Sequence, residues 1–199
     1  MNIQNTGQSY GLMARFLHWG MALAIFAMFA LGLWMRTLDY YSPWYKTGPD
    51  IHKSIGIILL IALGVRFLWR LINVRPDDSY LATSERAISH IVHWAFYLLL
   101  LAQMVAGYLI STVDGRAISV FGWFEVPSLY EQKGLEDTVG EIHEWMAYGL
   151  MALAALHVAA ALKHHFIDGD VTLKRMLFTS SPDLLQPDLS KEKQKGIPS

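Results

Sequence analysis

Histidine is the residue type with the widest chemical scope in this sequence. The chain has eight histidines and no cysteine among its 199 residues. Without cysteine there can be no disulfide framework, cysteine-ligated zinc, thiolate iron–sulfur cluster or covalently attached haem. Any bound metal must therefore be held by histidine, methionine or carboxylate side chains.

The spacing of His143 and His157 suits two sites stacked along one helix. The two residues are 14 positions apart, which is about 21 Å along an α-helix and about 40° short of four full turns. Both imidazoles would then share one helix face at different depths. A helix of this kind can give one axial ligand to each of two stacked haems, since each iron needs two such ligands.

Four long apolar stretches could position these histidines. Residues 16–35, 87–113 and 145–162 contain no Asp, Glu, Lys or Arg, and residues 54–69 are interrupted only by Arg66. A bilayer core requires about 20 apolar residues of helix. Buried helices of soluble bundles seldom stay uncharged for so long, and the first stretch is too long for the core of a cleaved signal peptide.

These lengths predict an all-α fold, a transmembrane four-helix bundle with both termini cytoplasmic. The predicted helices span about 14–36, 51–72, 86–112 and 141–165, in one membrane domain over residues 1–178 that precedes a polar cytoplasmic tail over residues 179–199. The orientation follows from 11 lysines and arginines on the side of the termini against 5 on the other side. The chain is therefore expected to be a multi-pass protein of the bacterial inner membrane.

Charge narrows the choice of partners. The formal net charge is −1, and no basic stripe with interleaved aromatic residues is present, so we expect no nucleic-acid partner. The predicted outer side has 5 basic and 9 acidic residues, a net charge of −4. Its longer loop, between residues 114 and 141, includes Phe121-Gly122-Trp123-Phe124 and is expected to rest on the bilayer or to cap the bundle.

Topology sorts the histidines into two levels. His52 and His143 fall at the outer level, where no other histidine is available. At the inner level His157 could pair with His18, His90 or His93, and spacing alone does not choose among them. Ionisable residues inside a membrane are costly and usually functional. Histidines at two matched depths therefore favour two metal centres.

The same residues resemble the bacterial cytochrome b561 family over about residues 8–178, and the related di-haem cytochrome b subunits of Ni/Fe-hydrogenases and formate dehydrogenases. No single motif is specific, but the set as a whole is. It comprises His18-Trp19, His52 with Gly56, Val65-Arg66-x-x-x-Arg70, Gly115 to Gly122 with Pro127, His143-Glu144, His157 and Lys163-His164-His165.

The resemblance implies two non-covalent haem b groups with bis-histidine ligation. Carried over, it pairs His18 with His157 and His52 with His143, and leaves His90 and His93 beside the inner haem, a propionate or a quinone. It further implies electron transfer between a quinone, most simply ubiquinone, near the cytoplasmic side and a redox partner on the periplasmic side, within a respiratory chain.

Three further residues are candidates for cofactor contacts. Arg66 and Arg70 lie four residues apart near the inner end of their helix, where they could pair with haem propionates or reach the lipid headgroups. His164 lies about two turns beyond His157 and could protonate a quinone or form a basic surface pair with Lys163.

Two other function classes stay open at this point. Some proteins that resemble this family oxidise superoxide and reduce quinone, although an acidic outer face would repel that anion unless Arg36, Lys46, Lys53 or Arg116 offset it. A haem-free transport or assembly subunit, with histidines serving proton or metal traffic, is the third reading. Its purified form would be colourless.

Overall fold

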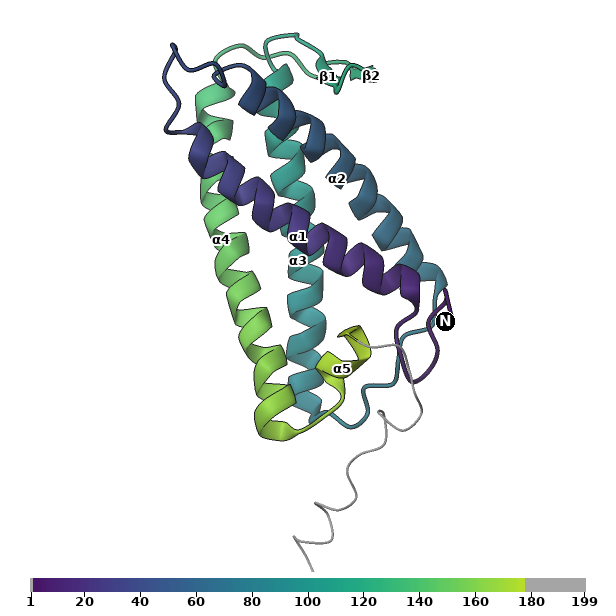
Figure 1. Cartoon of the computed structure of the whole chain (residues 1–199). Coiled ribbons are helices and arrows are strands. Elements are labelled where there is room, and N and C mark those ends of the chain that lie inside the picture. The colour runs from purple at the N-terminus through teal and green to yellow at the C-terminus, as the bar shows by residue number, and fades with distance from the viewer. Residues whose placement is uncertain (1, 178–199) are drawn as a thin grey trace, which may run out of the picture.

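Four antiparallel helices form the body of the protein (Figure 1). The computed structural model describes residues 2–177, and the helices are α1 (Leu12–Met35), α2 (Thr47–Ile72), α3 (Thr83–Thr112) and α4 (Glu136–Lys163). The four predicted helices are confirmed. The predicted tail over residues 179–199 lies outside the described residues.

All four helices begin earlier than the sequence predicts, by two to five residues. The predicted starts lie close to the apolar runs, whereas α2, α3 and α4 include acidic residues in their first turns, namely Asp50, Glu85, Glu136 and Asp137. Acidic side chains are favourable there because the amino-terminal end of a helix has a partial positive charge. The helices therefore extend beyond their apolar runs.

The helices pack unevenly against one another. Within residues 2–177, α4 packs closely along α3 but not along α1 or α2, whereas α1 packs on α2 and α2 on α3. Met21 of α1 and Leu59 and Leu63 of α2 form the buried apolar cluster at the centre. The bundle is therefore tight on one side and open between α4 and the α1–α2 pair.

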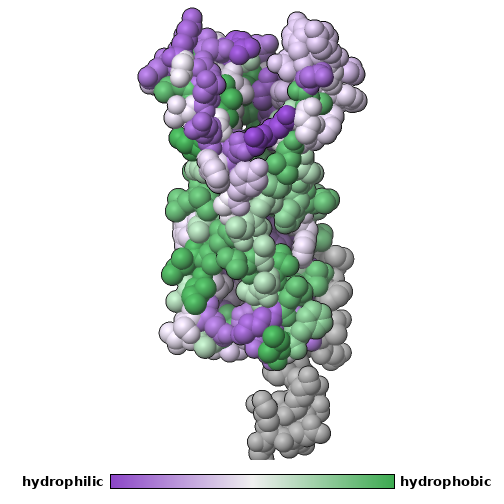
Figure 2. Space-filling model, turned by 90° about the vertical axis from the view of Figure 1, so that its left-hand side faces the viewer, coloured by the Kyte–Doolittle hydropathy of each residue, from purple (hydrophilic) through white to green (hydrophobic). Residues whose placement is uncertain are grey.

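Apolar side chains cover the outside of the bundle. On the face that Figure 2 shows, hydrophobic residues cover the middle and hydrophilic residues gather towards the two ends. Leu23, Leu98 and Leu156, from three different helices, are 74%, 64% and 69% exposed. Soluble proteins rarely expose so large an apolar area. All four helices are long and apolar enough to cross a membrane, which fits a multi-span membrane protein.

A β-hairpin interrupts the all-helical plan. Strands β1 (Ile118–Val120) and β2 (Phe124–Val126) pair antiparallel, with Ile118 opposite Val126. Three residues separate the paired Val120 and Phe124. The Trp123 amide donates to the Val120 carbonyl oxygen at 2.9 Å, and the two central residues of this turn have positive φ angles, 49° at Phe121 and 73° at Gly122, as in a type I′ turn. The end of the bundle with this hairpin is called the hairpin end below.

The opposite end, called the terminal end, is closed by the chain after α4. A short π-helix (His164–Asp168) follows α4 and leads to α5 (Thr172–Leu177). The indole Nε1 of Trp19 in α1 donates to the Met176 carbonyl oxygen at 3.0 Å. The amino-terminal segment lies at the same end, where the Asp77 amide donates to the Gly7 carbonyl oxygen at 2.7 Å. The two described termini therefore lie together (Figure 1).

Candidate functional site

Two imidazoles face each other at the hairpin end. His52 of α2 and His143 of α4 have ring centroids 6.2 Å apart. Imidazole nitrogens bind transition-metal ions at about 2 Å, and the ring centre lies about 1 Å behind the nitrogen, so an ion between two imidazoles separates their centroids by about 6 Å. The pair expected at this level therefore has the spacing of two axial ligands.

A cavity of about 300 Å³ surrounds this pair. Its walls come from all four long helices and from Ile118 of the hairpin, and most are apolar. Two buried polar atoms beside it, His52 Nδ1 and Gln103 Oε1, have no hydrogen-bond partner within residues 2–177. A buried polar atom left unpaired costs about 1–3 kcal/mol. An apolar cavity with few convergent polar groups is typical of a cofactor site.

Backbone groups fix the orientation of His143. Its Nδ1 lies 3.0 Å from the Gln103 carbonyl oxygen, and because a carbonyl can only accept, Nδ1 must donate. The lone pair is then on Nε2, the usual arrangement of a metal-ligating histidine. A Cβ atom at Gly107 would lie 3.0 Å from Cε1 of this ring. Only glycine leaves the ring in place without a shift.

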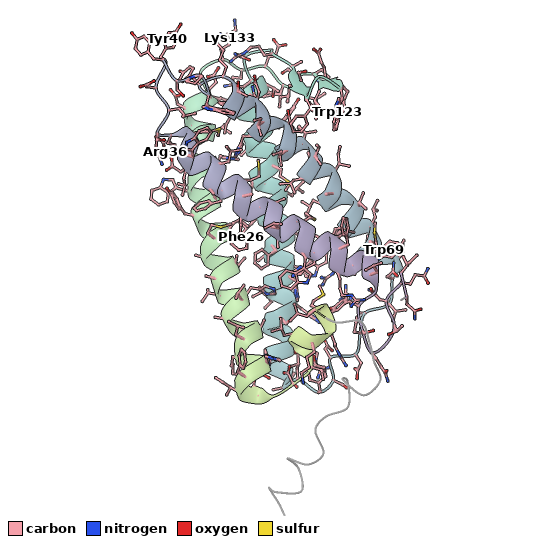
Figure 3. The ribbon with its side chains drawn as sticks, viewed as in Figure 1. Phe26, Arg36, Tyr40, Trp69, Trp123 and Lys133 are labelled. Atoms are coloured by element: carbon pink, nitrogen blue, oxygen red, sulfur yellow. The ribbon has the colours of Figure 1, made fainter. Side chains whose placement is uncertain are left out.

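Cations at the mouth of this cavity already have acidic partners. Arg36, labelled in Figure 3 at the hairpin end of α1, forms an ion pair with Glu144. Lys53 Nζ lies 2.8 Å from the Asp50 carboxylate. These exposed pairs contribute little to stability, but they neutralise the local charge. An acidic group of a cofactor would have to compete with these carboxylates.

Three histidines meet at the terminal end. The ring centroid of His157 in α4 lies 6.3 Å from that of His18 in α1 and 5.7 Å from that of His93 in α3. His90 lies elsewhere, because it is 46% exposed and its Nε2 is 3.1 Å from the Asp78 carboxylate. Of the three partners that spacing allows for His157, the structure therefore leaves His18 and His93.

Helix packing favours His18 over His93 as the partner of His157. His93 and His157 belong to α3 and α4, which pack directly on each other, whereas α1 and α4 have no comparable packing within residues 2–177. A flat macrocycle needs a gap between the helices that hold it. Both the His18–His157 and His52–His143 pairs span helices that are not packed together.

Arg66 lies directly beside this cluster. Its Nη2 is 3.2 Å from His18 Nδ1, and because a guanidinium can only donate, the histidine nitrogen accepts. Its other terminal nitrogen, Nη1, is buried without a hydrogen-bond partner in the described chain. An unpaired buried guanidinium nitrogen is suited to a carboxylate, which can accept two parallel hydrogen bonds from arginine.

The other two candidates have contacts outside the His18–His157 and His52–His143 pairs. The Arg70 guanidinium is 5.5 Å from the centre of the Tyr97 ring, a cation–π contact. His164 Nδ1 lies between two carboxylates, 3.0 Å from that of Asp168 and 2.7 Å from that of Asp170. The structure thus gives both residues local partners.

Sequence reasoning missed the contacts of three residues that shape the two sites. Gln103 supplies the carbonyl that orients His143, Phe96 contacts His157 with ring centroids 5.5 Å apart, and Glu144 holds Arg36. A glutamine within an uncharged span was a usable signal, because a polar side chain in a membrane needs a partner. Nothing in the spacing distinguishes Phe96 from other apolar residues of its helix.

Comparison with known proteins assigns the chain to a family. Residues 9–179 match the family described as prokaryotic cytochrome b561. The chain is 48% identical to cytochrome b561 homolog 2 of Escherichia coli over 186 residues, 92% of this chain and 98% of that protein. It is 30% identical to the probable superoxide oxidase CybB of Yersinia pestis over 81% of this chain and 91% of that protein.

A second E. coli protein, cytochrome b561 homolog 1, is 26% identical over 81% of this chain and 93% of its own length. The family match covers nearly the whole described chain, from the amino-terminal segment to the residues just after α5. This protein therefore belongs to the prokaryotic cytochrome b561 family of membrane proteins, a family that implies haem b as its cofactor.

Proposed function

We propose that this protein is a di-haem b-type cytochrome that passes electrons across the bacterial inner membrane. The observation that supports this most directly is the presence of two imidazole pairs, with ring centroids 6.2 Å and 6.3 Å apart, on helices that face each other across the bundle. His52 and His143 hold one haem, and His18 and His157 hold the other. Bound haem b supplies one-electron oxidation and reduction at its iron.

The residues of the chain place the two cofactors and set their surroundings. His143 and His157 put the two sites about 21 Å apart along α4, since 14 residues separate them. Gln103 holds His143 with Nε2 directed to the cavity, and the apolar walls exclude water. These groups position the cofactors and tune their potentials.

Arg66 is the residue placed to hold a propionate at the terminal-end site. A neutral imidazole has one lone pair, and at His18 the Nδ1 lone pair accepts from Arg66. If His18 bound iron through Nε2, its proton would be on Nδ1, and Arg66 would have to donate elsewhere. Its guanidinium could then pair with a propionate. Arg70 lies one turn further along α2, where it can neutralise a second carboxylate.

The two ends of the bundle serve different partners in this proposal. The excess of lysine and arginine near the terminal end supports cytoplasmic termini. A quinone, most simply ubiquinone, then exchanges electrons near the terminal end, with His93 and His164 as the candidate polar contacts to its head group. The hairpin end faces the periplasm and a separate redox partner.

The test is a reduced-minus-oxidised spectrum with a quantified haem-to-protein ratio on detergent-purified protein. The parent should contain two b-haems. His52→Ala and His157→Ala should each contain one, whereas His90→Ala, which removes an exposed histidine paired with Asp78, should keep two. A colourless parent would remove the electron-transfer proposal and leave the haem-free transport or assembly subunit.

A second candidate function is superoxide oxidation coupled to quinone reduction. It is supported by the 30% identity to a probable superoxide oxidase. Three of the five outer cations, however, are already paired with acids, namely Arg36 with Glu144, Lys53 with Asp50 and Arg116 with Asp114. These pairs and the net charge of −4 weaken an electrostatic funnel for an anion.

Neutralising the unpaired cations of the outer side tests whether superoxide or another molecule is the electron donor. Lys46 and Lys133 have no ion pair in the described chain, so they are the outer cations free to attract an anion. The double variant Lys46→Gln/Lys133→Gln should slow superoxide oxidation and leave the haem content at two. A rate equal to that of the parent at low ionic strength would discard the anion funnel.

A further inference from the structure

The hairpin is fixed to α2 by a buried serine. The Phe121 amide donates to Ser54 Oγ at 3.2 Å, and the Ser54 hydroxyl lies 2.8 Å from the Asp50 carbonyl oxygen and 3.3 Å from that of Ser119. Ser54 is 2% exposed. Ile118 and Val120 of β1 form a buried cluster with Ile57, one turn further along α2. The base of the hairpin therefore has one defined position.

This position coincides with the boundary between water and lipid. Asp50 and Lys53 are the last charged residues of α2 before an apolar run that continues to Arg66. Ser54 and Ile57 lie on one helix face, and the same face continues towards the middle of the bundle with Ile58, Ile61, Val65 and Leu68, all exposed. The hairpin covers only the outer end of a stripe that otherwise faces lipid.

The tip of the hairpin is apolar and uncovered. Phe121, Trp123 and Phe124 are 44%, 75% and 44% exposed, and the rings of Phe121 and Trp123 lie 5.5 Å apart. Figure 3 shows Trp123 at the edge of the molecule, on the side where the hairpin extends beyond the helix ends. Aromatic side chains of this kind, fixed at this level, match the headgroup region of a bilayer.

Backbone strain indicates that the aromatic side chain at position 121 has a role. Phe121 has a φ of 49° and is the only residue other than glycine with a positive φ in the described chain. A bulky residue at such an angle is a conformational outlier, and strain of this kind is kept where it serves a function. Glycine would make the same turn without strain.

We propose that Phe121, Trp123 and Phe124 insert into the headgroup–acyl boundary of the adjoining leaflet, so that the bilayer holds the hairpin against α2. Ile118, at the base of β1, lines the hairpin-end cavity. The membrane thereby keeps one wall of that cavity closed. The occupant of the exposed tip is phospholipid, because the tip continues the lipid-facing stripe of α2. The inference requires a membrane-spanning chain and no cofactor, so it can fail independently of the proposed function.

Depth measurement with single spin labels tests this directly, because the chain has no cysteine. Trp123→Cys and Lys133→Cys are labelled with a nitroxide, and the proteins are placed in nanodiscs of phosphatidylethanolamine and phosphatidylglycerol. Lys133 is the control, since it belongs to the same connection but is a charged residue of its exposed outer part. The label at 123 should collide severalfold more with oxygen than with a water-soluble nickel chelate, and the label at 133 should show the reverse.

Other occupants give different signals. Equal exposure of both labels to the nickel chelate would overturn the proposal. Spin–spin broadening at 123 would assign the tip to a second copy of the chain instead. Should Trp123→Cys not fold, quenching of tryptophan fluorescence by bromolipids answers the same question, because the parent should be quenched more than Trp123→Phe. Equal quenching would also overturn it.

Phe121→Gly separates lipid contact from turn formation. If position 121 served only the turn, glycine would relieve the strain and leave the tip where it is. Insertion predicts instead that Phe121→Gly raises the collision rate of the 123 label with the nickel chelate severalfold in nanodiscs. Leu129→Gly, which removes another exposed apolar side chain from the same connection, should leave this rate unchanged.

Discussion

The two histidine pairs consist of the same residue type within different frameworks. At the hairpin end the Gln103 carbonyl orients His143, Gly107 gives its ring room, and the nearby cations are paired with acids. At the terminal end Arg66 contacts His18 directly and keeps one buried nitrogen unpaired. Backbone groups thus preorganise one site, whereas a charged side chain shapes the other.

This difference has an electrostatic consequence. Oxidised haem iron carries one more positive charge than reduced iron, so a cation that offsets the negative charge of a propionate favours the reduced form. We therefore expect the terminal-end haem to have the higher reduction potential of the two. Under the proposed orientation, electrons that enter at the hairpin end would then pass downhill towards the quinone.

The largest effect should come from His18→Ala compared with His93→Ala. Both residues contact His157, but only His18 lies across a gap between unpacked helices. His18→Ala should lower the ratio from two haems to one per chain, and His93→Ala should keep two with a shifted spectrum. The measurement is haem quantification on purified protein. The opposite result would transfer the ligand role to α3 and contradict the argument from helix packing.

The sequence predicts the helices and the levels of the histidines well, and their surroundings poorly. Helix length follows from bilayer thickness, and His143 and His157 share a face because helix geometry is regular. Long-range contacts do not follow from any local pattern. Arg66 reaching His18 and the Gln103 carbonyl reaching His143 depend on how helices pack, and the hairpin forms although Phe121 opposes its turn.

Arg66→Gln should lower the reduction potential of one haem. Removal of the charge destabilises the reduced form, and the shift should be on the order of tens of millivolts. Arg70→Gln is the matched control on the same helix, where the guanidinium lies over Tyr97, and should shift the potential less. A potentiometric titration resolves both haems. A shift confined to the lower-potential haem would contradict the placement of Arg66 beside the higher-potential, terminal-end haem.

Gly107→Ala should weaken the hairpin-end site only. The added methyl group meets Cε1 of His143 at 3.0 Å, so the ring must move, and overpacking of this kind costs about 1–3 kcal/mol. We expect slower haem binding and earlier loss of one haem on heating, with the other retained. Gly149→Ala in α4 is the control, because a Cβ there meets nothing within 4 Å. Equal loss from both variants would indicate a general helix defect.

The smallest expected effect is a change in thermal stability when the aspartate of one turn at each end of the bundle is replaced. The two turns should lose similar amounts of stability. The Arg116 amide and then its side chain lower the pKa of Asp114 at the hairpin end, and the Ser79 hydroxyl and amide lower the pKa of Asp77 at the terminal end. A carboxylate whose pKa is lower in the folded state stabilises the fold at pH values above its ordinary pKa of 3.8. This stabilisation is lost as the pH falls through the pKa of the folded state. Asp114→Asn and Asp77→Asn should therefore melt slightly below the parent near about pH 7, and this difference should shrink towards about pH 3. Because neither carboxylate is buried, the shifts should be small and similar. That result would place the difference between the two ends in their histidine sites, whereas a larger shift at one end would place part of the difference in the loops.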